Sequence, residues 1–400
     1  MKKTLLAAAL MVGFAGVAQA ETSVTLYGVV DGGIGYQRLK GSAAGDIEGM
    51  GLYDHDRGTS FRNTRTGLFD GGAMGQRGNR WGLRGSEDLG DGLRFIFQLE
   101  SGFNIATGNQ MQGNAENDRL FGREAHFGLA GDNWGQLTFG RQTSITSLYM
   151  PGIASPFAAS WGQANYGATF SAANTTRYDN SIQYQTPSFA GFQFGLGYSF
   201  NIDGAQRGTT KINGEKTKHD TKAWTAALRY ANGPIAVGAS YDQYTDRTGM
   251  KDYSTLDAGR VTAKEWALAG SYDFEMVKLH LGGGQTRDGF FTNQFNGYGL
   301  GQSFHAQKGL RVNNYTVGLS APVGAGEIMA SWAMGDLRKL PHGLRDADLK
   351  TKKQQTYSLG YTYPLSKRTN VYAIGSYAKN VNFAPDLKST AVGVGVSHQF

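Results

Sequence analysis

Two arginines of the segment 80–88 are the first residues in this sequence that could act on a charged ligand. Trp81 and Leu83 alternate with Arg80 and Arg84, and side chains of a β-strand point alternately to opposite faces. The pattern predicts a strand with one apolar face and one face that carries both guanidinium groups. Guanidinium groups attract anions without covalent chemistry, so this face predicts electrostatic recognition and not catalysis.

Two further arginines are candidates for the same polar face. In the segment that begins at Arg177, Tyr178 and Tyr184 have one parity, which predicts that they point outward and that Arg177 points inward. Arg123 is less constrained by its strand. Alternation counted back from Phe127 points it outward, whereas a bulge near the strand end would turn it inward.

Two carboxylates have the parity that would place them beside these arginines. Glu100 and Glu124 fall on the polar faces of the segments 93–103 and 121–131. Both are therefore candidates for inward negative charge that opposes the arginines.

Other residue constellations predict neither catalysis nor a cofactor. The chain has no cysteine, which excludes disulfides, thiolate chemistry and cysteine-ligated zinc, and its seven histidines do not recur at metal-ligand spacing. The run 282–284 is all glycine but is followed by neither a helix nor Gly-Lys-Ser, so it is not a phosphate-binding loop. The run Asp54-His55-Asp56 could hold a divalent cation, although a solvated loop is the simpler interpretation. We expect no cofactor and no metal site.

The N-terminal residues carry the features of a secretory signal. Lys2 and Lys3 precede an apolar run over 5–17, and the segment ends in Ala18-Gln19-Ala20. This order predicts a signal peptide over 1–20 and a single mature domain over 21–400. The formal net charge of +7 is spread along the chain and does not form a basic arm, so it does not predict nucleic-acid binding.

Alternation with a period of two residues recurs through the rest of the chain. It predicts about sixteen strands, over 23–36, 80–88, 93–103, 121–131, 134–142, 177–186, 191–201, 222–231, 234–244, 263–273, 277–287, 311–321, 326–335, 354–364, 369–379 and 389–400. Short turns of Gly, Asn and Asp alternate with long connections, at 37–79, 143–176, 203–221, 245–262, 288–310 and 336–353.

These features together predict an all-β transmembrane barrel. Short turns at one end and long loops at the other are typical of outer-membrane barrels, and an even number of strands puts both termini on the short-turn side. A polar average composition, with a mean hydropathy of −0.39, is compatible with a membrane because only alternate residues of a barrel strand face lipid. Aromatic residues near strand ends, including Tyr27, Trp266 and Phe400, predict girdles at the two membrane interfaces.

Several segments together resemble the trimeric porins of β-proteobacteria. They are Glu21–Asp31, Arg80–Leu93, Trp134–Gln142, Tyr184–Phe192 and the terminal Phe400. The resemblance covers the whole mature chain and implies a 16-stranded antiparallel barrel, a homotrimer, and a third loop folded into the pore as a constriction. It implies a water-filled outer-membrane channel for passive diffusion of small hydrophilic solutes and ions, with both termini periplasmic. The implied partners are outer-membrane lipid, lipopolysaccharide and the outer-membrane assembly machinery.

The resemblance also implies roles for single residues. Basic residues at the positions of Arg80, Arg84, Arg123 and Arg177 line the constriction in this family. An arginine at the position of Arg141 tends to lie at the subunit interface, and a terminal aromatic residue, here Phe400, is read by the assembly machinery.

The third loop carries no Asp, Glu, Lys or Arg between Gln142 and Thr176. Relatives usually place a carboxylate before the Pro156-Phe157 step, where this chain has Ser155. A loop without charge would leave the arginines unopposed from that side, so we expect a preference for anions. Glu100 and Glu124 are the charges that could offset this preference. The alternatives are a substrate-specific channel for a sugar or an anion, an outer-membrane barrel enzyme, and a structural barrel with a plugged lumen.

Overall fold

The computed structural model describes residues 22–43, 59–113, 119–170, 177–202, 208–212, 215–219, 221–252, 255, 257–290, 305–344 and 350–400. The predicted signal peptide over 1–20 and the run Asp54-His55-Asp56 lie outside the described residues.

A single antiparallel sheet closes on itself to form a barrel with sixteen strand positions. The positions are occupied in chain order by β1 (Ser23–Ala43), β2 (Thr59–Asp70) together with β3 (Arg80–Gly90), β4 (Leu93–Phe103), β6 (Glu124–Gly131), β7 (Gly135–Thr143), β8 (Arg177–Gln185), β9 (Phe192–Ser199), β12 (Lys222–Asn232), β13 (Ile235–Asp252), β14 (Asp257–Asp273), β15 (Lys278–Phe290), β16 (His305–Val323), β17 (Gly326–Lys339), β18 (Gln354–Pro364), β19 (Thr369–Lys379) and β20 (Lys388–Gln399). β1 pairs with β20 on one side and with β2 and β3 on the other, so no strand edge is left free. The predicted fold class is confirmed.

The outer face of the barrel is apolar because alternate residues point outward. Ile34 and Val394 are exposed, whereas their strand neighbours Gly35 and Gly393 lie inside. Exposed apolar side chains in this arrangement suit contact with lipid hydrocarbon, and the closed ladder pairs the backbones of neighbouring strands around the barrel.

The strands are longer on the loop side than the sequence predicted. The interval 37–79, predicted as a loop, contains the end of β1 and all of β2, and these two strands pair from Gly32 and Asp70 to Ala43 and Thr59. The interval 203–221, also predicted as a loop, contains a small separate hairpin of β10 (Gly208–Ile212) and β11 (Glu215–His219). Threonine-, lysine- and glycine-rich sequence hides the period of two residues in these segments, so both predictions were wrong.

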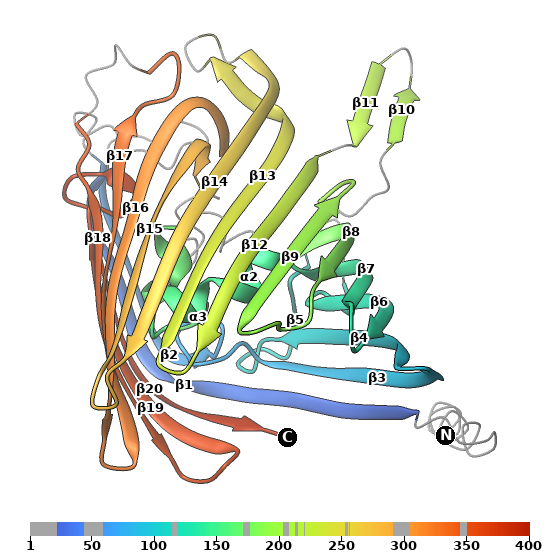
Figure 1. The fold of residues 1–400 in the computed structure, drawn as a ribbon. Helices are drawn as coiled ribbons and strands as arrows, with labels where there is room; N and C mark the ends of the chain where they lie inside the picture. The colour runs from blue at the N-terminus through green and yellow to red at the C-terminus, as the bar shows by residue number, and fades with distance from the viewer. Residues whose placement is uncertain are drawn as a thin grey trace, which may run out of the picture.

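The barrel has a tall side and a short side. The strands from β13 to β17 are 13 to 19 residues long, whereas those from β6 to β9 are 8 or 9 residues long. Figure 1 shows the tall strands rising well above the short ones, and two short helices lying within the curve of the sheet. Among the described residues no helix is long and apolar enough to cross a bilayer.

Candidate functional site: the lumen between the third loop and the arginine wall

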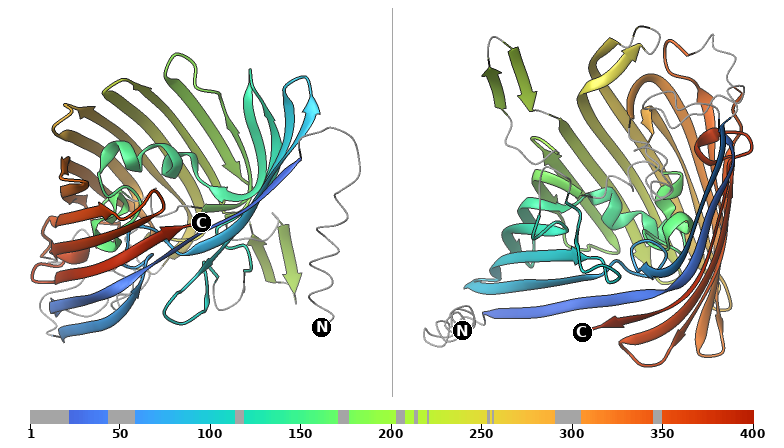
Figure 2. Two further views of the ribbon diagram at one scale, coloured as in Figure 1. Left: turned by 90° about the horizontal axis from the view of Figure 1, so that it is seen from below. Right: turned by 180° about the vertical axis from the view of Figure 1, so that it is seen from behind.

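The third loop, between β7 and β8, folds into the barrel. It forms α2 (Ile145–Tyr149), α3 (Pro151–Ala154) and two single 3-10 turns, η2 (Gly162–Ala164) and η3 (Tyr166–Ala168). Ser144 caps α2 by accepting a hydrogen bond from Ser147 N, and a proline at the first position starts α3. Figure 2 shows these turns enclosed by the ring of strands when the barrel is viewed from below.

Polar contacts fasten this loop to the tall side of the barrel. Thr146 Oγ1 donates to the Asp242 carboxylate of β13. His280 Nδ1 of β15 lies 3.0 Å from the Ile153 carbonyl oxygen, and Gln354 Nε2 of β18 donates to the Ala168 carbonyl oxygen at 2.9 Å. The loop is thus held at several points along one wall, which fixes its position across the lumen.

Glycines on the wall make room for the loop. A side chain at Gly318 of β16 would place its Cβ 2.4 Å from Pro156 Cδ, and one at Gly360 of β18 would place its Cβ 2.9 Å from Phe157 Cε1. Both contacts are shorter than van der Waals distance, so the loop packs directly on the backbone of the wall.

A second segment, 71–79, folds into the lumen between β2 and β3. The Asn79 side chain accepts a hydrogen bond from Asp31 N and donates one to the Asp31 carbonyl oxygen at 2.8 Å, and Tyr372 OH donates to Asp31 Oδ1 at 2.6 Å. The tip of the third loop rests on this segment, since Trp161 N donates to the Gly75 carbonyl oxygen at 3.0 Å. The sequence prediction missed this inward turn and placed it in an outer loop.

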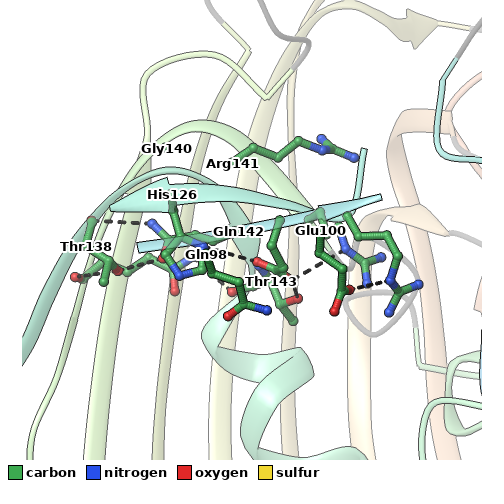
Figure 3. Close-up of polar contacts among 12 residues, drawn as sticks. Gln98, Glu100, His126, Thr138, Gly140, Arg141, Gln142 and Thr143 are labelled. Carbon is green, nitrogen blue, oxygen red and sulfur yellow. Dashed lines mark hydrogen bonds and ion pairs between the residues drawn. The ribbon is translucent and has the colours of Figure 1, made fainter. Parts of the chain in front are cut away.

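Facing the third loop, the short side of the barrel carries the predicted charges. Arg123 Nε lies 2.5 Å from Glu100 Oε1, and Arg80 Nε lies 3.8 Å from Glu100 Oε2. Figure 3 shows Glu100 extending toward the two guanidinium groups. β6 begins only at Glu124, so Arg123 is outside the alternation of that strand and turns inward. The structure thus brings three of the predicted residues together.

A second group of predicted charges adjoins the first. Glu124 Oε1 accepts from Thr143 Oγ1 at 2.5 Å and lies 3.7 Å from Arg177 Nε. His126 Nδ1 lies 3.4 Å from Glu124 Oε2. Each glutamate is therefore shared between basic side chains, and both glutamates are buried.

The strand parity assumed for Tyr178 was wrong. Its side chain is buried inside the barrel, and its hydroxyl lies 3.2 Å from Asp242 Oδ1 as a donor. A register shift opposite Arg141 and the left-handed backbone of Asn180 break the alternation of β8. Arg177 is the first residue of β8, and this position at the end of the strand brings it near Glu124. The prediction from alternation placed Arg177 inward for a different reason.

Arg84 faces the lumen, and among the described residues neither its side chain nor that of Arg77 has a carboxylate partner. The Arg84 guanidinium carbon lies 5.3 Å from the centre of the Tyr27 ring, a cation–π contact. Tyr27 points inward and donates to Glu100 Oε2 at 2.9 Å, so its predicted place in an outer girdle was wrong. Arg77, in the inward segment, is close enough for its charge to act on that of Arg80. The sequence prediction missed Arg77.

Arg229 is a further basic side chain that the prediction missed. Its guanidinium carbon lies 4.9 Å from the ring centre of Tyr149 in α2, and Tyr149 OH donates to Gln185 Oε1 at 3.1 Å. Burial raises the pKa of Tyr149 to about 12, and the charge of Arg229 acts in the opposite direction. Tyr149 therefore stays neutral at physiological pH. A period-two pattern with Ala223 and Ala227 could have revealed Arg229.

Ser155 is the predicted residue that the structure does not bring to the charged group. It is buried between α3 and the wall, and its Oγ accepts from Phe157 N at 3.2 Å. The Ser155 hydroxyl stabilises the turn that leads into Phe157, so its hydrogen bond is made inside the third loop and not with the charged side chains.

Arg141 points away from the charged group, as Figure 3 shows. It forms an ion pair with Asp179, and its Nε donates to the Gly122 carbonyl oxygen at 2.8 Å. Arg119 pairs with the same carboxylate at 2.7 Å. Arg141 and Arg119 thus share one carboxylate of their own chain.

Phe400 lies at the seam between the first and last strands. Its backbone exchanges two hydrogen bonds of 3.1 Å with Gly28, and its ring covers Gly28 so closely that an added Cβ would lie 2.2 Å from Phe400 Cζ.

A closed barrel with an apolar exterior and a polar, charged interior crossed by an inward loop defines a transmembrane β-barrel channel. The sequence model of the Gram-negative porin family matches residues 7–382, and the chain belongs to that family. Among the described residues no group of side chains is arranged to hold a metal ion.

Individual relatives agree with this assignment. An outer membrane porin protein of Bordetella pertussis is 49% identical over the full length of both chains, and outer membrane porin protein 32 of Delftia acidovorans is 30% identical, also over the full length of both. The solved structure of an anion-selective porin from Comamonas acidovorans has a TM-score of 0.64 at 26% identity, covering 95% of this chain and 100% of its own. The protein is a porin of the outer membrane, and porins are channels rather than enzymes.

Proposed function

We propose that this porin passes small hydrophilic anions in preference to cations. The observation that carries the proposal is the difference between the two sides of the lumen. The third loop has no charged residue between Gln142 and Thr176, while the opposite side carries five arginines and two buried glutamates. The arginines are Arg77, Arg80, Arg84, Arg123 and Arg177.

The balance of these charges favours anions because the carboxylates are already shared. Glu100 is paired with two arginines and Glu124 with Arg177 and His126. Asp31 contacts the inward segment 71–79 and Asp242 contacts the third loop, and both carboxylates are buried. A solute therefore meets guanidinium groups first, and a narrow passage between low-dielectric walls strengthens their field. The anion-selective porin from Comamonas acidovorans, which is similar over the whole fold, supports this proposal.

The test is the zero-current potential in a planar bilayer across a tenfold salt gradient. The wild type should give the sign of an anion-preferring channel. The variant Arg77→Gln/Arg84→Gln should move the potential toward zero, since neither side chain is paired with a carboxylate of the described residues. A matched variant, Lys367→Gln/Arg368→Gln, changes two charges in the exposed turn between β18 and β19 and should leave the potential unchanged. A cation preference in the wild type would overturn the proposal.

A substrate-specific channel is the second candidate, favoured by the closeness of Arg77 and Arg80. Such a channel shows current that one solute blocks saturably, whereas a general channel shows block proportional to solute size. Titration of the open-channel current with small organic anions separates the two.

We also propose a homotrimer in which the short side of each barrel meets its neighbours. Its short strands and the polar pair Arg141–Asp179 support this, because a lipid-facing arginine at mid-membrane would cost about 2–4 kcal/mol. A Vibrio cholerae outer membrane protein of the same fold has been solved in a trimer form. Chemical cross-linking in the native membrane should give a three-chain band.

Two proposals concern export and assembly. Residues 1–20 act as a signal peptide that is removed before the barrel folds, and N-terminal sequencing of the membrane form should begin at Glu21. Phe400 serves as the signal that the assembly machinery reads, and the variant Phe400→Ser should accumulate as unfolded precursor.

A further inference from the structure

The connection between β19 and β20 folds inward at one end of the barrel. It comprises residues 380–387, which we call the mouth turn, and its centre is the 3-10 turn η5 (Val381–Phe383). Phe383 packs with Val312 of β16, and Leu387 is fully buried. The mouth turn lies at the end where the long connections are, and this end faces the cell exterior in outer-membrane barrels. It therefore stands at the outer entrance of the lumen.

The backbone of the mouth turn is held in a conformation that its sequence does not favour. Asn380, Asn382 and Phe383 have φ angles of 54°, 52° and 65°. Asparagine adopts this left-handed region with little difficulty, whereas a bulky aromatic residue rarely does. A strained backbone of this kind persists only where surrounding contacts hold it. The position of the mouth turn therefore depends on its contacts with the rest of the barrel.

Two of these contacts are hydrogen bonds to the start of β18. Lys352 N donates to the Phe383 carbonyl oxygen at 2.9 Å. Asn382 N donates to Gln354 Oε1 at 2.8 Å. Gln354 is the first residue of β18, and its side chain is fully buried inside the barrel. One inward side chain thus receives the tip of the mouth turn.

The same amide group also holds the third loop. Gln354 Nε2 donates to the Ala168 carbonyl oxygen of η3 at 2.9 Å. The two partners fix the direction of the amide, because a backbone N–H binds only its oxygen and a backbone carbonyl binds only its nitrogen. A buried amide that loses one partner keeps an unsatisfied polar atom, which costs free energy. Each hydrogen bond of Gln354 therefore stabilises the other.

A second glutamine fixes the third loop to the strands that carry the mouth turn. Gln163 of η2 is buried, and its Nε2 donates to Ser376 Oγ of β19 at 3.1 Å. Its Oε1 accepts from Ser389 Oγ of β20 at 2.6 Å. These partners belong to paired strands and not to the turn itself. Gln163 therefore anchors the loop, whereas Gln354 joins it to the turn.

We propose that Gln354 is a positioning residue that couples the mouth turn to the third loop. Displacement of the turn from outside withdraws Asn382 N from the amide, and the amide then loses its fixed direction toward Ala168. The third loop becomes more mobile at η3, and the passage between the loop and the arginine wall changes with it. An event at the outer entrance thus reaches the inside of the channel through one side chain.

The first test measures the mobility of the third loop with a spin label. The chain has no cysteine, so the exposed residue Ala159 can carry a single label as Ala159→Cys. Its neighbour Ala158 accepts from Tyr166 N of η3 at 2.9 Å, so the label senses motion of η3. In the paramagnetic resonance spectrum, Gln354→Met should raise the ratio of mobile to immobile label about fivefold, the effect of one lost hydrogen bond.

A matched control lies one residue further along β18. Gln355 points outward, where its Oε1 accepts from Tyr357 OH at 2.6 Å and from Trp332 Nε1 at 3.3 Å. Gln355→Met makes the same chemical change on the opposite face and should leave the label as in the wild type. Gln354→Asn keeps the amide but shortens the side chain, so that it cannot reach both partners. It should behave like Gln354→Met.

The second test asks whether the mouth turn acts through Gln354. Phe383→Gly removes the ring that packs with Val312 and frees the backbone of the turn. It should raise both the mobility of the Ala159→Cys label and the noise of the open-channel current in a planar bilayer. In the Gln354→Met background it should change neither, because the turn is already disconnected from the loop.

Three results would overturn the proposal. They are unchanged label mobility in both Gln354 variants, an equal rise in Gln355→Met, and additive effects of Phe383→Gly and Gln354→Met on mobility and noise. None of these substitutions changes a charge, so the zero-current potential should keep its wild-type value. The coupling and the proposed anion preference are therefore tested by separate measurements.

Discussion

Glu100 sets the charge of the arginine wall at the scale of single residues. It accepts from Tyr27 and lies against both Arg80 and Arg123. One carboxylate thus holds two guanidinium groups in place and offsets one of their two positive charges. Its removal should therefore change both the ion selectivity of the pore and the positions of the two arginine side chains.

We expect Glu100→Gln to increase the anion preference. The substitution removes one negative charge and keeps the shape of the side chain, so the net charge of the lumen rises by one. The zero-current potential should shift further in the anion direction, while Glu87→Gln, in an exposed position near the short turn of β3, should have no effect. A shift toward cations would show that the arginines lose their inward position without Glu100.

Parity predicted residue placement well inside regular strands and poorly at their ends. Arg80 and Arg84 lie on the inner face as Trp81 and Leu83 indicated. Tyr178 and Tyr27 were misplaced because an aromatic ring with a hydroxyl suits both a lipid interface and a polar interior. The direction of Arg123 depended on where β6 begins, which alternation alone does not define.

At the scale of elements, the third loop depends on the small residues beneath it. The loop was predicted from its lack of charge and its aromatic residues, and its position against the tall wall follows from glycines that alternation treats as neutral. The inward segment 71–79 was not predicted, because its polar anchor Asp31 lies some forty residues earlier in the chain.

The variant Gly318→Val should displace the third loop. Its side chain would meet Pro156, which cannot yield because its ring is fixed. We expect a changed single-channel conductance and noisier open current. Gly283→Val is the matched control on the adjacent strand, since a Cβ there has no contact shorter than 3.9 Å. Equal conductance in both variants would mean that the loop's position does not set the current.

At the scale of the whole molecule, stability depends on the seam between β1 and β20. β1 has 21 residues and pairs with three strands, and the last residue of the chain is bound to Gly28. The strand count and the pairing of the two ends could be predicted from the sequence, because short turns and long loops alternate. The strand lengths could not, because polar strand ends above the membrane lack an apolar face.

Gly28→Val should weaken the closed barrel. The added side chain would clash with the Phe400 ring and with the Arg80 carbonyl oxygen, 2.8 Å from the new Cβ. The temperature at which the folded form loses its fast mobility in a detergent gel should fall. Gly375→Val, whose Cβ would meet nothing nearer than 3.9 Å, should melt like the wild type. Identical melting of the two variants would show that the seam does not limit stability.

The pairing of Gly28 with Phe400 also orders events in time. The ribosome synthesises β20, the partner of the first strand β1, last. Until synthesis ends, the backbone hydrogen-bonding groups along one edge of β1 therefore have no partner strand. An incomplete chain therefore cannot insert stably into the lipid bilayer. A product that lacks one terminal strand would stay in the periplasm as an open sheet with unpaired edges that are prone to aggregation. The geometry of the closed sheet thereby makes a complete chain a condition for insertion, in addition to the signal that we propose the assembly machinery reads at Phe400.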